Sequence, residues 1–152
     1  VMTALIGTAT SAPTLLEDFM HVELEVIGAC RATMAALAGV DERALVAGLR
    51  DEHEEALRQL KRLSMRFRAE CPEDGTVNEA RTLGRIKLAA RRGGDGLVLE
   101  ALDTALAQAA AAYRRGLRNA ALPESMVLIL TRSLENVERH RVALRRAATL
   151  AA

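Results

Sequence analysis

Two histidines and one glutamate are the residues best able to do chemistry here, because each interrupts an apolar helical stripe. His53 lies between Leu49 and Ala56 on the apolar side of a long amphipathic segment. Glu23 lies inside the apolar arc of the preceding segment, and His140 lies at the edge of the buried side of the last one. Imidazole and carboxylate groups are metal ligands, so these three residues are candidates for a metal site.

The elements that must position Glu23 and His53 are two long helices joined by a very short connection. The first is expected to begin at Thr14, with Thr14 and Glu17 as a capping box, and to end at Gly39. The second is expected to begin at Asp41 and to continue to about Glu70. A connection this short predicts an antiparallel hairpin.

Folding the chain back near Val40 places Glu23 opposite Ala56, about one helical turn, or ~5 Å, from His53. We therefore expect these two side chains to meet inside the protein. A core cannot leave either of them unpaired, so a hydrogen-bonded structural pair is favoured over a metal site.

Three further helices are predicted after this hairpin. They are a short one over Thr76–Arg92, a long one over Leu97–Asn119 capped by Asp95, and a last one that starts at Pro123. In the second of these only the Tyr113 hydroxyl interrupts the stripe and needs a partner.

Residues 1–13 are expected to be a flexible N-terminal tail, and residues 14–152 a single domain. The first ten residues carry neither a signal-peptide pattern nor a hydrophobic run long enough for a membrane span.

Composition and charge narrow the classes of partner. Half of the residues are apolar, 27% are charged, and the formal net charge is +1. This balance argues against a dedicated nucleic-acid or membrane-surface protein, so neither partner is expected. The basic segment that ends in Arg91 and Arg92 is read as a solvated face rather than a nucleic-acid surface. Cys30 and Cys71 are expected to be reduced thiols in a cytoplasmic protein.

The first helix carries more apolar residues than one bundle interior usually needs. Its flanking stripe predicts a homodimer, because one helix rarely leaves so many large apolar groups uncovered. This stripe consists of Leu16, Met20, Ile27 and Met34.

Two long antiparallel pairs joined by a stretch with its own short helix predict an all-α fold. The expected architecture is a ferritin-like four-helix bundle with a short extra helix in the crossover. Five short stretches, in their order and spacing, resemble a bacterial ferritin-like four-helix-bundle family of unknown function. These stretches are residues 75–77, 94–100, 112–117, 122–123 and 137–140.

Ferritin-like metal proteins hold two irons with a Glu from each of two helices and a Glu-x-x-His from each of the others. Here Arg50 stands three residues before His53, and Val137 stands three before His140. The third-helix carboxylate position falls on Leu106 or its neighbour Ala105. The resemblance therefore implies a degenerate di-iron site.

The function expected from this ligand set is that of a non-enzymatic dimeric protein without a cofactor, with an interaction or stress-related role and an unknown protein partner. The alternative is a metal-binding oxidoreductase or storage protein. It would hold a single divalent ion of iron, zinc or manganese on Glu23, His53 and His140.

Overall fold

The computed structural model describes residues 5–72 and 77–151, and every regular element in these ranges is a helix. The prediction of an all-α fold is confirmed for this part of the chain. The helices are α1 (Ala12–Ala36), α2 (Val40–Phe67), α3 (Val77–Arg92), α4 (Gly94–Leu117) and α5 (Glu124–Ala151).

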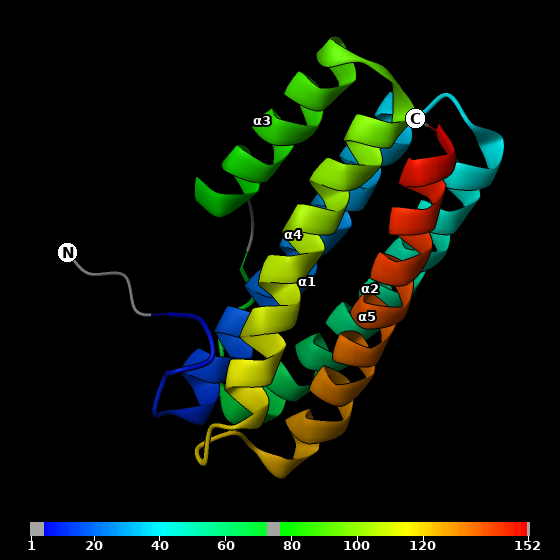
Figure 1. Ribbon diagram of the computed structural model, residues 1–152. Coiled ribbons are helices and arrows are strands. Elements are labelled where there is room, and N and C mark those ends of the chain that lie inside the picture. The colour runs from blue at the N-terminus through cyan, green and yellow to red at the C-terminus, as the bar shows by residue number, and fades with distance from the viewer. Residues whose placement is uncertain (1–4, 73–76, 152) are drawn as a thin grey trace.

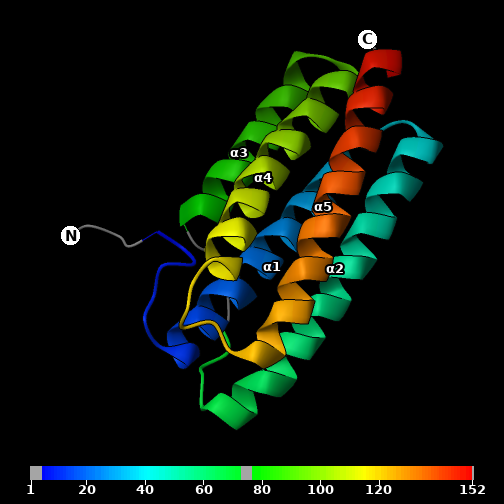
Figure 2. The same cartoon turned by 60° about the horizontal axis from the view of Figure 1, so that its bottom comes forward.

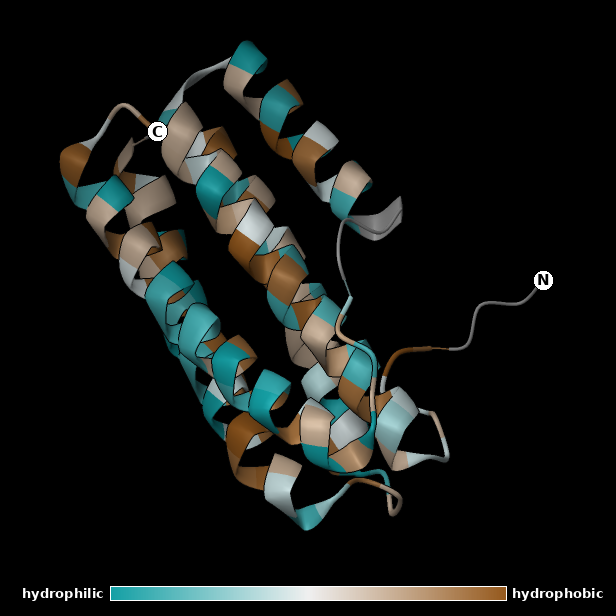
Figure 3. Ribbon diagram, turned by 180° about the vertical axis from the view of Figure 1, so that it is seen from behind, coloured by the Kyte–Doolittle hydropathy of each residue, from teal (hydrophilic) through white to brown (hydrophobic). Residues whose placement is uncertain are grey.

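The four long helices lie side by side along a common direction (Figures 1 and 2). Helices α1 and α2 form one antiparallel hairpin, and α4 and α5 form another. The two hairpins meet along α1 with α4 and along α2 with α5. The shorter α3 lies outside this group against α1 and α4, and it returns the chain to the end where α4 begins. Hydrophobic and hydrophilic residues are mixed along the helices (Figure 3). At helical spacing, such a mixture lets a helix turn an apolar side toward the core.

The extra apolar stripe of α1 is covered within the single chain. Leu16, Met20 and Ile27 are buried, and the half-buried Met34 packs against the core. Helix α1 contacts α2, α3 and α4, so it needs a wider apolar arc than a helix with two neighbours. The observation that motivated a dimer through this stripe is thereby explained by packing inside one chain.

The start of α1 differs from the predicted capping box. The helix begins two residues earlier, and Ser11 is its N-cap, with the Ser11 hydroxyl accepting from the Thr14 amide at 3.4 Å. The Glu17 carboxylate instead accepts from the Glu70 backbone amide at 2.9 Å. Helix α2 ends at Phe67 rather than at Glu70, because Arg68 adopts a left-handed conformation with φ of 54°.

The prediction that Asp95 caps α4 is wrong, because that helix already begins at Gly94. The two carboxylate oxygens of Asp95 accept from the backbone amides of Ala38 and Gly39, at 2.9 and 2.8 Å. These two bonds lower the pKa of the Asp95 carboxyl. Asp95 therefore ties the connection between α1 and α2 to the start of α4.

Residues 5–11 of the expected tail lie against the end of α4. The Arg115 guanidinium donates to the Ile6 carbonyl oxygen at 2.9 Å, and the Asn119 amide donates to two further carbonyl oxygens of this segment. Gly7 has a φ of 94°, and a Cβ there would come within 2.9 Å of the Gly116 nitrogen. Residues 1–4 and the predicted cap Thr76 lie outside the described residues.

Candidate functional site

Glu23 and His53 form a direct pair in the centre of the helix bundle. Nδ1 of His53 lies 2.5 Å from Oε2 of Glu23. Glu23 is fully buried, and His53 is 1% exposed. The predicted meeting of these two side chains is confirmed, because the short connection at Gly39 folds α2 back along α1 in the expected register.

Two further side chains complete this site from the other hairpin. The Tyr113 hydroxyl on α4 donates to Oε1 of Glu23 at 2.7 Å, and the Ser133 hydroxyl on α5 donates to the same oxygen at 3.0 Å. Tyr113 is fully buried and Ser133 is 1% exposed. We call Glu23, His53, Tyr113 and Ser133 the polar cluster. Each long helix contributes one of its members, so the cluster links all four.

The hydrogen-bond inventory of the polar cluster assigns roles to individual atoms. An ionised carboxylate only accepts, so His53 presents its Nδ1–H to Glu23, while Tyr113 and Ser133 present their hydroxyl protons. Both oxygens of Glu23 are then engaged. Nε2 of His53 is buried, and it has no hydrogen-bond partner among the described residues.

Tyr113 is held as a neutral hydrogen-bond donor. Burial raises the pKa of its phenol well above the usual value, and the neighbouring Glu23 carboxylate raises it further. The Tyr113 ring stacks on Phe19 at a centroid distance of 6.0 Å and on His53 at 6.4 Å. This packing fixes the direction of the hydroxyl toward Glu23.

His140, the third predicted ligand, contacts other groups. Its Nδ1 lies 2.8 Å from the Asn136 carbonyl oxygen, and a carbonyl can only accept, so this nitrogen carries a proton. The same Nδ1 lies 3.6 Å from Oε2 of Glu52, whose other oxygen accepts from Arg139 at 2.7 Å. His140 thus belongs to the contact between α2 and α5 at the edge of the core.

The donor set does not fit a metal ion in the arrangement described. Residues 5–72 and 77–151 contain no group of three His, Cys, Asp or Glu side chains placed to hold one. The Glu23 oxygens are occupied by hydrogen bonds, and Nδ1 of His140 donates to a backbone carbonyl. Coordination by Glu23, His53 and His140 together would require these contacts to break.

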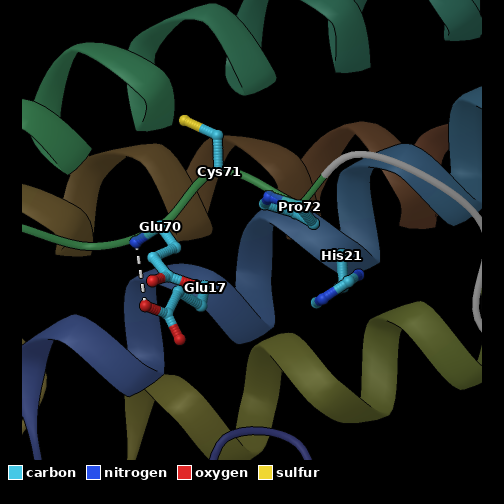
Figure 4. A pocket seen from close by; sticks show the side chains of 5 residues that line it. All are labelled: Glu17, His21, Glu70, Cys71 and Pro72. Carbon is cyan, nitrogen blue, oxygen red and sulfur yellow. Dashed lines mark hydrogen bonds between the residues drawn. The ribbon is translucent and has the colours of Figure 1, made fainter.

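A surface pocket of about 500 Å³ lies where the segment after α2 crosses α1 (Figure 4). Glu17 accepts there from the Glu70 backbone amide, and His21 lies apart from both. The pocket therefore offers no converging ligand set.

Both cysteines are free thiols: Cys71 is exposed at this pocket, whereas Cys30 is buried. Burial raises the pKa of the Cys30 thiol to about 12, so it is an inert part of the core.

Ser133 is the member of the polar cluster that sequence reasoning missed. The buried side of α5 includes Met126, Leu130, Ser133, Val137 and His140, at alternating spacings of four and three residues. A hydroxyl in such a stripe indicates a hydrogen-bond partner in the core. Its position between Leu130 and Val137 was the available signal.

In comparisons with known proteins, no family model, curated protein or solved structure matches this chain. None of the helices in the described ranges is long and apolar enough to cross a membrane.

Proposed function

We propose that this chain is a non-enzymatic bundle protein with an interaction or stress-related role, in which the polar cluster serves stability. One observation carries this proposal: both oxygens of the buried Glu23 carboxylate are engaged by His53, Tyr113 and Ser133. Protein donors thus occupy three of the roughly four acceptor positions of this carboxylate. It satisfies the buried polar groups and links four helices.

The proposed family is a bacterial ferritin-like one with a degenerate di-iron site, and the proposed location is the cytoplasm. The chain path supports the family, because α3 returns the chain between two antiparallel hairpins, which is ferritin-like connectivity. The absence of Glu at positions 50 and 137, where Arg and Val stand, supports the loss of the metal site.

The second candidate function is a metal-binding oxidoreductase or storage protein. It is favoured by a single observation, the buried Nε2 of His53 without a hydrogen-bond partner. An imidazole nitrogen with a free lone pair is a metal ligand, and its other nitrogen is oriented by a carboxylate, as in many metal sites.

Metal analysis of the protein purified without a chelating column separates the two candidates. We expect less than one equivalent of iron, zinc or manganese and a melting temperature that does not change with EDTA. Stoichiometric metal, together with a chelator-induced fall in melting temperature that the added ion reverses, would establish the second candidate instead.

A homodimer remains part of the proposal, although the stripe that suggested it is covered inside the chain. Light scattering at micromolar concentration checks it by the molar mass in solution. A mass of 16.4 kDa, that of one chain, would remove the dimer from the proposal.

A further inference from the structure

Helix α3 has an inner and an outer side, and its outer side is exposed. Thr82 and Ile86 are buried against the bundle. The opposite side, which we call the α3 outer face, is exposed along the helix. It consists of Ala80, Arg81, Gly84, Arg85, Lys87, Leu88, Arg91 and Arg92.

The α3 outer face concentrates positive charge. Helix α3 carries five basic residues and only Glu79 as an acidic one, so its formal charge is +4, whereas the whole chain has +1. None of the five basic side chains forms an ion pair with a described residue. By contrast, Arg139 and Arg141 on α5 each pair with a carboxylate of another helix. The positive charge of the α3 outer face thus has no ion-pair partner among residues 5–72 and 77–151.

Gly84 lies at the middle of this face. At about 100° per residue, all five basic side chains fall within about 100° of it around the helix. A Cβ at Gly84 would meet no atom within 4 Å. Packing inside the chain therefore does not require glycine there, although glycine in an exposed helix interior is unfavourable relative to alanine.

Two apolar residues continue along the same line. Ala80 lies one turn before Gly84, and Leu88, which is 45% exposed, lies one turn after it. Helices approach more closely where the side chains at their contact are small. Ala80, Gly84 and Leu88 thus form a low apolar line with Lys87 on one flank, Arg81, Arg85 and Arg92 on the other, and Arg91 near its end.

We infer that the α3 outer face docks an acidic amphipathic helix of a partner protein, an inference that rests on the proposed interaction role. Carboxylates on both flanks of such a helix would meet the basic side chains, and its apolar side would lie over Gly84 and Leu88. The apolar line through Gly84 favours such a helix over a polyanion. Phosphate groups are contacted by long basic side chains and would gain nothing from a glycine at position 84.

Other occupants fit the face less well. A membrane surface requires more buried apolar area than one exposed leucine supplies. A second copy of this chain could offer the acidic side of α2, but Asp51 and Glu55 there are already paired with Arg50 and Arg58. An external acidic helix brings carboxylates that are free to pair.

The probe for the test is a fluorescent, hydrocarbon-stapled helical peptide of Ala, Leu and Glu, with one Ala/Leu stripe and Glu on both flanks. We expect saturable binding by fluorescence anisotropy. The same peptide with Gln in place of Glu should bind at least about tenfold more weakly, because the charge pairing is lost. Equal binding of both peptides would overturn the inference.

Two pairs of variants locate the site. Gly84→Leu should weaken binding at least about tenfold without changing the charge, whereas Gly48→Leu, at an exposed α2 glycine that also faces open space, should not. Lys87→Glu with Arg91→Glu should abolish binding, whereas Lys61→Glu with Arg62→Glu on α2, which changes the net charge equally, should not.

Competing ligands complete the experiment. Peptide binding that survives Gly84→Leu would overturn the inference in favour of a general anion surface. So would binding of a DNA duplex or of phosphatidylglycerol vesicles with the same affinity as the Glu peptide. So would self-association of the unmodified protein that Gly84→Leu abolishes, because the occupant would then be a second copy. Metal analysis tests the metal-free proposed function with a readout that does not involve the peptide, so its failure and the failure of this inference can be told apart.

Discussion

The Tyr113 hydroxyl donates a hydrogen bond of 2.7 Å to the Glu23 carboxylate across 90 residues of sequence. Both side chains are fully buried, and each belongs to a different hairpin. This bond therefore reports whether the two hairpins are packed together. A variant that breaks it tests the role of the polar cluster without altering either hairpin internally.

Replacing Tyr113 with Phe removes that donor and keeps the ring. We expect a loss of about 1–3 kcal/mol in the free energy of unfolding, because a carboxylate oxygen loses a buried partner. Denaturant unfolding measures it. A Tyr113→Phe protein as stable as the unmodified one would show that Ser133 alone satisfies Oε1 of Glu23.

His53→Leu should lower the free energy of unfolding by more than an ordinary core substitution, since it leaves Oε2 of Glu23 buried without its partner. An unpaired buried group of this kind costs about 1–3 kcal/mol, and more while it stays charged. Combining it with Glu23→Gln should cost less than the sum of the two single changes, because each change alone already breaks the pair. Additive losses in the free energy of unfolding would contradict a coupled pair.

Three helical glycines should respond differently to alanine. Gly48→Ala and Gly84→Ala should each stabilise the protein by about 1 kcal/mol, since a Cβ there meets open space and alanine favours the helix. Gly116→Ala should destabilise it by about 1–3 kcal/mol, because the new Cβ would lie 2.4 Å from the buried Phe19 ring. Thermal unfolding of the three variants ranks them, and stabilisation by Gly116→Ala would contradict the close packing of α4 on α1.

Alkaline pH should destabilise the protein in part through Cys30. Burial raises the pKa of its thiol to about 12 in the folded state, against 9.0 for an ordinary thiol. This contribution to stability is present below pH 9 and is lost as the pH rises toward 12, because the unfolded chain releases the proton first. Stability measured from pH 8 to 11 should fall less steeply in Cys30→Ala than in the unmodified protein.

A thiol reagent at pH 8 should modify Cys71 and leave Cys30 intact in the folded state.

Acid should loosen the contact made by Asp95. Its backbone hydrogen bonds lower its carboxyl pKa, so their contribution is present above the ordinary value of 3.8 and is lost as the pH falls through the lower folded-state value. Asp95→Asn should reduce the melting temperature at pH 7 and flatten its dependence on pH in this acid range. The exposed Asp51→Asn serves as the control. Equal effects of the two changes would mean that the link between Asp95 and the α1–α2 connection adds nothing.

Much of the fold followed from local patterns in the sequence. The apolar periodicity indicated each long helix, and the short connection at Gly39 was enough to set the register that brings Glu23 beside His53. Helix ends were less well predicted, because Ser11, Thr14 and Asp95 can each cap a helix or bind a distant backbone amide. The choice among these partners depends on which amides the folded chain brings near.

By itself, then, the sequence determined the helical class and the contact inside the first hairpin, since both depend on residues close along the chain. Only the tertiary structure decided that Tyr113 and Ser133 complete the polar cluster, and that packing within the chain covers the stripe on α1 from which we predicted a dimer. The rotation of one hairpin against the other sets these contacts. That rotation comes from packing side chains that are far apart in the sequence, which helical periodicity does not encode.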